Sequence, residues 1–544
     1  MFIREQFVGR EDVIKVINKR LSDLKEGYRQ NIALLGDELT GKTWIIRFIF
    51  DNLSDPKIIP LYFDLSQATA NTFTQRFFNV LLFNFLKTKG IILPKENTAK
   101  LIEEAKTHIP NTVLKIQNIS SSNAAKDKLD ISAFRDILGL LETLNQETGQ
   151  KMVIIFDEFQ NLEYLKIRSI FQEFGKKIML QKNTMYIVLS SSKIRAKKII
   201  QDELSLLFGN FETIDINNFD NRASNILIRN RLRNAPVSQD IINFLINFTG
   251  GNPFYLDKIA QHIYQNAIIL KSDTISPFVF IYSLEEILFN KWGLLNLRFQ
   301  NYIDLFNSKN KPDTLDLLLS IAQGKNKIKD LSSLLHKTYR DINQKLSKLT
   351  ESNIIYRSGC FYNITDRVFN FWLNFVYLEK LNSISQNYDD QIISFRKKIE
   401  QSLLEFITIS KKDIPQRLYE LLTLFTNDSV RLGRNKILLS KFKEIEFLNF
   451  DGRHIKKGFI CLSDDECWLI GFKDGDITED CVCEFIKESK KIQTREKSLR
   501  RLIIGLDKTE INASLLAKEE KIFTWDIEHL NTLLDLYAKP RLII

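Results

Sequence analysis

The most constraining feature of this sequence is a glycine-rich motif between a strand-like run and a helix-like run. Residues 31–35 read Asn-Ile-Ala-Leu-Leu, and residues 44–50 are apolar apart from one arginine. Between them stand, in the order G-x-x-x-x-G-K-T, Gly36, Asp37, Glu38, Leu39, Thr40, Gly41, Lys42 and Thr43. This order, with a strand before it and a helix after it, predicts a phosphate-binding loop.

The residue types of this loop suit a bound triphosphate. Glycines allow backbone N–H groups to turn inward around phosphate oxygens, and the following helix adds its positive end. We expect Lys42 to reach the β- and γ-phosphates and the Thr43 hydroxyl to bind Mg²⁺. The sequence therefore predicts ATP and Mg²⁺ as ligands, with the eight motif residues and Trp44 around the nucleotide.

A second apolar run, residues 151–156, ends in Asp157 and Glu158. A continuous apolar run is typical of a strand buried on both faces of a parallel sheet, and ligands bind at the carboxyl edge of such sheets. We expect Asp157 to hold Mg²⁺ through water and Glu158 to polarise the attacking water. An Asp-Glu pair is also common in solvated turns. Here it indicates a nucleotide site because a phosphate-binding motif precedes it in the sequence.

Two further strand-like runs, residues 58–64 and 184–189, complete a predicted α/β core, a parallel sheet with helices on both faces. Ser191 lies in the serine cluster that follows the second run, where a γ-phosphate sensor is needed, although such clusters also cap helices. The composition is globular, with 44% hydrophobic and 26% charged residues. No apolar run approaches the length of a bilayer span, and the N-terminus lacks the apolar run of a signal peptide, which predicts a cytoplasmic protein without membrane segments.

Three further segments resemble archaeal-type ATPases. Residues 7–11 (Phe-Val-Gly-Arg-Glu), 250–256 (Gly-Gly-Asn-Pro-Phe-Tyr-Leu) and 362–377 are similar to ordered motifs of that family. These ATPases belong to the STAND class of signal-transducing P-loop NTPases, which is related to the origin-recognition AAA+ ATPases. The resemblance implies that Phe7, Val8, Arg10 and Pro253 lie on the adenine or ribose side of the nucleotide.

One departure from the family concerns hydrolysis. Its members often carry an arginine after the glycine that follows the last core helix, whereas Asn210 follows Gly209 here. If that arginine acts across a subunit interface, its loss implies slow turnover or a nucleotide-locked switch.

The chain is predicted to contain a P-loop core (1–220), a helical lid (221–295), a winged helix (296–383) and a C-terminal nuclease-like domain (384–544). Three amphipathic helices, near residues 314–322, 328–335 and 340–349, precede a hairpin at 353–364, which is the winged-helix pattern. Its third helix would present Arg340, Asn343, Lys345 and Lys348 to DNA. The same sequence is equally compatible with a winged helix that binds protein, in which these basic residues form a solvated face.

The C-terminal part resembles the restriction-endonuclease-like domain of these ATPases. Nuclease chemistry needs an acid-x-Lys strand, but the matching strand reads Gly471-Phe-Lys473, with Asp451 and Glu400 as the other candidate acids. A degenerate domain is therefore expected. Four cysteines at 461, 467, 481 and 483 lie among apolar, strand-like residues, which favours buried thiols over zinc.

The net charge of +10 and the isoelectric point near 9.0 favour a polyanionic partner. We therefore expect an ATP-binding switch that hydrolyses ATP, as its motifs indicate, and that couples its nucleotide state to DNA binding through the winged helix. The alternatives are a protein-sensing signalling or defence module and an active metal-dependent nuclease. ATP-dependent oligomerisation is compatible with each of them.

Overall fold

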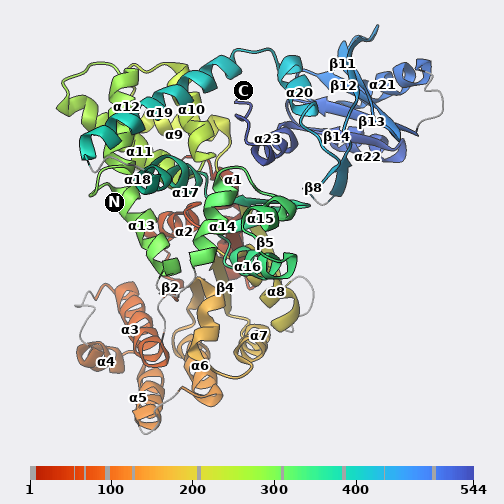
Figure 1. Cartoon of the computed structure of the whole chain (residues 1–544). Helices are drawn as coiled ribbons and strands as arrows, with labels where there is room; N and C mark the ends of the chain where they lie inside the picture. Colours follow the sequence, from red (N-terminus) through yellow and green to blue (C-terminus); the bar gives the residue numbers. More distant parts are fainter. Residues whose placement is uncertain are drawn as a thin grey trace. The chain divides into compact units, whose positions relative to one another are not determined.

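The computed structural model describes residues 8–543 apart from short segments at 54, 67–68, 92–97, 125–128, 205–209, 308–311, 383–386, 434 and 493–497. The chain divides into two compact units (Figure 1). The first unit comprises residues 1–227 and 252–254, and the second comprises residues 228–251 and 255–544. None of the helices in the described ranges is long and apolar enough to cross a membrane.

The first unit is built on a five-stranded parallel sheet in the order β2-β3-β4-β1-β5. Its strands are β1 (Asn31–Gly36), β2 (Ile58–Asp64), β3 (Lys151–Asp157), β4 (Thr184–Ser190) and β5 (Phe211–Ile216). Every residue of β1 and β4 is buried, which explains their largely apolar sequences. The predicted parallel P-loop ATPase core is confirmed.

Successive residues of β1 point into different hydrophobic clusters, one on each face of the sheet. Ile32 packs with α1 (Glu11–Lys25) and α2 (Lys42–Asp51), whereas Ala33 packs with the opposite helices. Those helices are α3 (Ala70–Thr88), α4 (Thr98–Lys106), α5 (Pro110–Ala124), α6 (Ile131–Thr148) and α7 (Ile170–Leu180). Helices α4 and α5, which lie between β2 and β3 in the sequence, thus contribute to the core. The short helix α8 (Lys193–Lys198) follows β4, and α9 (Asn221–Arg231) follows β5.

The second unit begins with helices and continues into three helices and a hairpin. The first group is α10 (Gln239–Thr249), α11 (Pro253–Ile269), α12 (Pro277–Leu288) and α13 (Leu294–Asn307). The second group is α14 (Pro312–Ala322), α15 (Ile328–Leu334), α16 (Tyr339–Glu351), β6 (Ile355–Ser358) and β7 (Phe361–Ile364), the last two paired antiparallel. This is the order of elements expected of a winged helix, and that assignment stays a prediction, as do the domain boundaries.

Helical segments lead from the hairpin to the last part of the chain: α17 (Arg367–Trp372), the π-helical η4 (Leu373–Tyr377), α18 (Leu378–Asn382), α19 (Tyr388–Ser410) and α20 (Ile414–Leu422). A two-stranded pair follows, β8 (Asp428–Leu432) with β9 (Asn435–Leu439). A five-stranded sheet then runs in the order β10-β11-β12-β13-β14, antiparallel up to β12 and parallel beyond it. Its elements are β10 (Glu444–Asn449), β11 (Lys457–Leu462), β12 (Glu466–Lys473), α21 (Glu479–Lys491), β13 (Ser498–Gly505), α22 (Ile511–Glu519), β14 (Ile522–Trp525) and α23 (Ile527–Leu536).

The turn of the β6–β7 hairpin is in close contact with β8. Gly359 has φ 63°, and a Cβ there would lie 1.8 Å from the Ser429 carbonyl oxygen. Cys360 N donates to that same oxygen over 2.9 Å. Phe361 belongs to the hydrophobic core formed by α20 and the C-terminal sheet, which includes Trp468. The hairpin and the C-terminal part therefore share one core.

The position of the expected nuclease carboxylate is apolar. A Cβ on Gly471 of β12 would lie 2.8 Å from the Phe485 ring and 3.1 Å from Ile455, so a carboxylate there would meet apolar side chains. Glu400 lies exposed on α19, and Asp451 follows β10 in a loop. In the described part of the chain, no group of three or more His, Cys, Asp or Glu side chains is placed to hold a metal ion.

The four C-terminal cysteines differ from the expectation that all occupy strand-like surroundings. Cys461 and Cys467 are buried in β11 and β12, but Cys481 and Cys483 lie on helix α21, where Cys483 is exposed. The Thr478 side chain caps that helix by accepting from Cys481 N, and acidic residues fill its first turn. These capping signals outweighed the strand-like local sequence.

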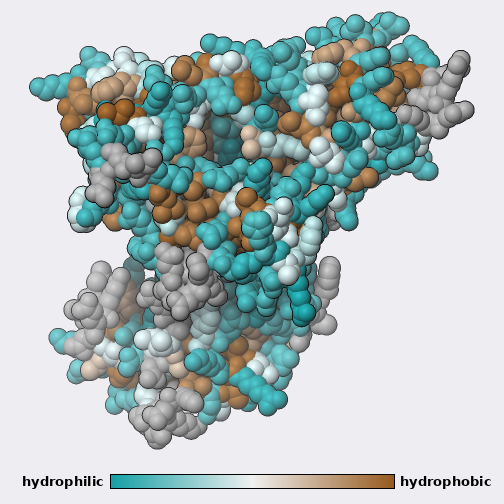
Figure 2. Space-filling model, in the orientation of Figure 1, coloured by the Kyte–Doolittle hydropathy of each residue, from teal (hydrophilic) through white to brown (hydrophobic). Residues whose placement is uncertain are grey.

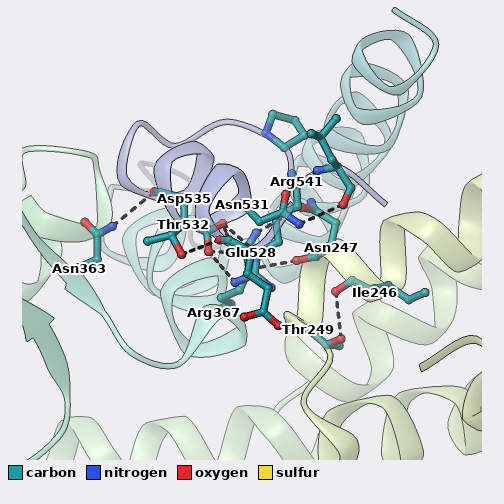
Figure 3. A network of polar contacts seen from close by, with 12 residues as sticks. Ile246, Asn247, Thr249, Asn363, Arg367, Glu528, Asn531, Thr532, Asp535 and Arg541 are labelled. Atoms are coloured by element: carbon teal, nitrogen blue, oxygen red, sulfur yellow. Dashed lines mark hydrogen bonds and ion pairs between the residues drawn. The ribbon is translucent and has the colours of Figure 1, made fainter. Parts of the chain in front are cut away.

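A buried ionic network joins three distant segments of the second unit (Figure 3). Asp535 of α23 accepts hydrogen bonds from Arg367 of α17 and from Arg541, whose Nε lies 3.0 Å from Oδ2. Arg367 Nε also donates to the Asn247 carbonyl at 3.0 Å, and Arg541 N donates to Asn247 Oδ1 at 3.0 Å. The network links α10, α17 and the C-terminal residues.

Candidate nucleotide site

The phosphate-binding loop leaves β1 in a tight turn. Leu39 and Gly41 have positive φ, at 63° and 91°, and the Gly41 conformation favours a residue without Cβ. Thr40 Oγ1 donates to the Asp37 carbonyl over 2.9 Å and braces the loop from within. Gly36 also passes close to the end of β5, because a Cβ there would lie 2.4 Å from the Ile216 carbonyl oxygen. The two glycines thus have different roles. Gly36 allows the close approach of β5, and Gly41 allows the left-handed backbone conformation of the loop.

Lys42 points into this loop from the first turn of α2. Its Nζ donates to the carbonyl oxygens of Gly36 at 2.9 Å and Asp37 at 2.8 Å. Only 5% of the residue is exposed, and burial lowers the pKa of the ammonium group. A buried ammonium held by two carbonyls can exchange them for phosphate oxygens.

Asp157, at the carboxyl end of β3, lies beside Thr43. Its Oδ2 accepts from Thr43 Oγ1 and from the Tyr62 hydroxyl of β2, both over 2.7 Å. Burial raises the pKa of the Asp157 carboxyl, against the two hydrogen bonds, which lower it. Burial and the Asp157 charge likewise raise the pKa of Tyr62. A carboxylate and a hydroxyl in contact offer the oxygen ligands that Mg²⁺ prefers, so these residues fit the ion.

Glu158 and Ser191 meet at the same edge of the sheet. Glu158 Oε2 accepts from Ser191 N at 3.0 Å, Ser191 Oγ at 2.7 Å and Gln160 Nε2 at 2.6 Å. Glu158 itself has φ 54°, a left-handed conformation that is strained for a non-glycine residue. Three donors on one oxygen fix the direction of this carboxylate.

Arg10 lies next to the loop and marks a further side of the site. Its Nη2 donates to the Thr40 carbonyl at 3.2 Å and to the Asn217 carbonyl, and its guanidinium lies 4.7 Å from the centre of the Phe219 ring. Burial lowers the pKa of Arg10 to about 10. Val8 is half-buried at the start of the described chain, whereas the predicted residue Phe7 lies outside the described residues.

Pro253 and its neighbour Asn252 belong to the first unit and lie at the loop. A Cβ on Gly41 would be 3.9 Å from Pro253 Cγ, and Asn252 Nδ2 donates to the Glu38 carbonyl over 3.5 Å. Trp44 follows on α2 and is 53% exposed. Of the predicted residues outside the loop sequence, Arg10 and Pro253 are thus placed beside the loop by direct contacts.

Three polar residues of the site, Tyr62, Gln160 and Lys193, were not predicted. Tyr62 and Gln160 contact the two carboxylates described above. Lys193, at the start of α8, lies 3.6 Å from Asp37 Oδ2 and donates to Asn217 Oδ1 over 3.2 Å. Of these residues, only Lys193 had a signal in the sequence, because it directly follows the serine cluster. Asn210, at the position where the family often carries an arginine, is half-buried, and its carbonyl oxygen accepts a hydrogen bond from Asn31 Nδ2 at 3.1 Å. The preceding residues 205–209 lie outside the described residues.

The predicted nucleic-acid residues lie on α16 in the second unit. Arg340, Asn343 and Lys348 are exposed. Lys345 points elsewhere, because its Nζ lies 2.5 Å from Asp313 Oδ2 of α14. The structure therefore brings three of the four residues to the exposed surface of the helix and places the fourth in an ion pair.

Residues 7–259 match a family model described as an ATPase domain predominantly from Archaea. Comparison with curated protein sequences gave no match. A Walker-type ATPase of Pyrococcus abyssi is 17% identical with a TM-score of 0.49, over 68% of this chain and 97% of the other. The Aeropyrum pernix ORC2 protein, in ADPNP and ADP complexes, is 11% identical with a TM-score of 0.42, over 70% and 97%.

The RuvB Holliday-junction branch-migration motor of Thermotoga maritima is 10% identical with a TM-score of 0.33, over 68% of this chain and 96% of the other. These low values transfer no activity from the solved structures. The family match and the loop geometry together carry the assignment. Residues 7–259 match the archaeal-type ATPase domain, and the protein is an ATPase.

Proposed function

We propose that this protein is an ATP-hydrolysing molecular switch whose nucleotide state controls the binding of DNA by the second unit. ATP hydrolysis is supported by one observation. Lys42, the Thr43–Asp157 pair and the Glu158–Ser191 pair converge at one edge of the sheet. These are the groups needed to bind a triphosphate, hold Mg²⁺ and direct a water molecule.

Each residue has a distinct role in this proposal. Lys42 leaves the loop carbonyls and binds the β- and γ-phosphates, and Thr43 and Asp157 hold Mg²⁺, which neutralises phosphate charge when bound. Glu158 orients the attacking water and accepts its proton. Ser191, which shares a hydrogen bond with Glu158, senses the γ-phosphate. Arg10 and Pro253 border the adenine or ribose.

DNA binding is proposed for the exposed side of α16. Arg340 and Lys348 supply positive charge there, Asn343 supplies an amide, and the whole chain carries a net charge of +10. A phosphate backbone attracts such a surface in a salt-dependent way.

A second candidate is a protein-sensing STAND module, and one observation favours it. The β6–β7 hairpin turn, which a winged helix would extend along DNA, is packed against Ser429 of β8. In that case the second unit binds a protein, and the basic face of α16 is solvated.

The test is ATP turnover by the full-length protein at low salt, with and without duplex DNA. The proposal expects turnover that rises with DNA and that disappears in Lys42→Ala. Steady turnover without DNA binding, with a nucleotide-dependent change in oligomeric state on gel filtration, would favour the second candidate. Absence of ATP binding to the unmodified protein would refute both.

Tyr62→Phe should raise the Mg²⁺ concentration that half-saturates turnover about tenfold, the lower range for loss of a hydrogen bond to a metal ligand. The phenol hydroxyl that orients Asp157 is lost, while the ring is kept. Tyr186→Phe is the matched control, because it removes a buried hydroxyl of the same sheet that binds Gln181 instead. An unchanged Mg²⁺ dependence in Tyr62→Phe would contradict this role.

A further inference from the structure

A cavity of about 460 Å³ opens in the second unit between the starts of α15 and α16 and the β6–β7 hairpin. It is lined from α16 by Tyr339, Arg340 and Asn343, and from the hairpin by Arg357 and Tyr362, with Ile328 and Cys360 completing it. Its volume is in the range of sites that hold small organic ligands. In Figure 2 the visible surface around these helices is mostly hydrophilic, with apolar residues interspersed.

The cavity offers positive charge and no acidic side chain among its described lining residues. The side chains of Arg340 and Asn343 are exposed and make no hydrogen bond within the described ranges. Arg357 donates through Nε to the Gly359 carbonyl at 2.9 Å, which leaves its terminal nitrogens available. An anionic ligand group is the chemistry that complements two guanidinium groups.

The cavity also offers flat aromatic surfaces. The Tyr339 ring is at the mouth, with 55% of the residue exposed, whereas Tyr362 is 4% exposed and lies 5.4 Å from the Arg357 guanidinium. A solvent-exposed tyrosine next to a partly apolar cavity can stack on a planar ligand. Aromatic faces combined with arginines are the usual means of holding an unstacked base and its phosphate.

We infer that this cavity binds one unpaired nucleotide of a nucleic-acid strand, with the base against Tyr339 and the phosphate at Arg340 and Arg357. The inference deepens the proposed function, because it rests on nucleic-acid binding by α16 and names the form of the strand. A paired base presents only its edges in the grooves and cannot enter a cavity until it leaves the stack. The Lys345–Asp313 ion pair further removes one cation from the set that a groove-reading helix would use.

The test is fluorescence anisotropy with a labelled single-stranded 20-mer, the matching duplex, and a free deoxymononucleotide as competitor, without ATP. The single strand is expected to bind at least about tenfold more tightly than the duplex. Tyr339→Ala should weaken single-strand binding at least about fivefold, the lower range for one stacked base, and Tyr339→Phe should restore it. Arg340→Gln should lower the salt dependence by about one phosphate contact.

Tyr28→Ala is the matched control, because Tyr28 is also exposed, at 74%, and belongs to the first unit. Thermal melting of each variant verifies that the fold is intact, as expected for an exposed position. Duplex binding as tight as single-strand binding, or a Tyr339→Ala protein that binds like the unmodified one, would overturn the inference. Efficient competition by the mononucleotide would indicate a small-molecule site and would also overturn it.

These outcomes separate the inference from the proposed function. Duplex that stimulates ATP turnover while the single strand is ignored would leave the switch standing and remove the unpaired-nucleotide site. Tyr339-dependent single-strand binding with no effect on turnover would support the unpaired-nucleotide site and remove the coupling of ATP turnover to DNA.

Discussion

Glu158→Gln is expected to bind ATP as tightly as the unmodified protein and to hydrolyse it at least about 10²-fold more slowly, the lower range for loss of a general base. The amide oxygen can still accept from Ser191, whose N and Oγ lie 3.0 and 2.7 Å from Glu158 Oε2, so the local geometry is kept. What is lost is the ability to accept a proton. Single-turnover hydrolysis and equilibrium nucleotide binding, measured on the same preparation, separate the two steps.

Two other variants show whether this loss is specific. Lys42→Ala should lose binding itself, because the Lys42 ammonium group is the one that binds the loop carbonyls of Gly36 and Asp37, where the phosphates are expected. Ser191→Ala should reduce turnover less than Glu158→Gln, because it removes one of three donors and leaves the base. Equal turnover in Glu158→Gln and the unmodified protein would assign the base to another residue.

Asp535→Asn is expected to lower the free energy of unfolding of the second unit by about 3–5 kcal/mol, the range for removing one partner of a buried ion pair. The carboxylate is 12% exposed and binds both Arg367 and Arg541, so its neutralisation leaves two guanidinium groups without a counter-charge. Denaturant unfolding monitored by tryptophan fluorescence measures the difference, since Trp372, Trp468 and Trp525 all lie in this unit.

Glu528→Gln is the matched control, because Glu528 is an exposed carboxylate on the same helix, where a change should cost less than about 0.5 kcal/mol. Burial alone would raise the pKa of Asp535, but the charges of Arg367 and Arg541 hold it below its usual value. A carboxyl with a lowered folded-state pKa stabilises the fold above its unfolded pKa, about 4, and this is lost as the pH falls through the folded value. The difference between Asp535→Asn and the unmodified protein should therefore shrink below about pH 4, and a constant difference would contradict the ionic explanation.

The nucleotide core was predictable because its signals are local. The loop of residues 36–43 occupies consecutive positions, and the buried strand ending at Asp157 shows as an unbroken apolar run. Tyr62 and Gln160 were not predictable, because their roles depend on which strands are neighbours. A tyrosine near the end of β2 looks like any half-buried strand residue until β2 is placed beside β3.

The C-terminal part was predictable only in pieces. Strands β10 to β13 coincide with apolar runs in the sequence, whereas the short β8, β9 and β14 have weaker patterns. Helix α21 contains Cys481-Val482-Cys483, which suggests a strand, and only Thr478 with the acidic residues after it marks a helix start. The ionic network of Asp535 joins residues nearly 300 positions apart, which no local pattern reveals.

The shared core of the hairpin and the C-terminal sheet has a practical consequence for dissecting this protein. Phe361, at the start of β7, is 1% exposed and packs in one cluster with Trp468 and Leu530. A fragment cut between residues 383 and 386 would turn this buried surface into an exposed apolar patch on one piece and an open cavity lining on the other. We expect the two fragments to aggregate, or to be soluble only when they are produced together. The contribution of the C-terminal part is therefore better studied by point substitutions in the intact chain.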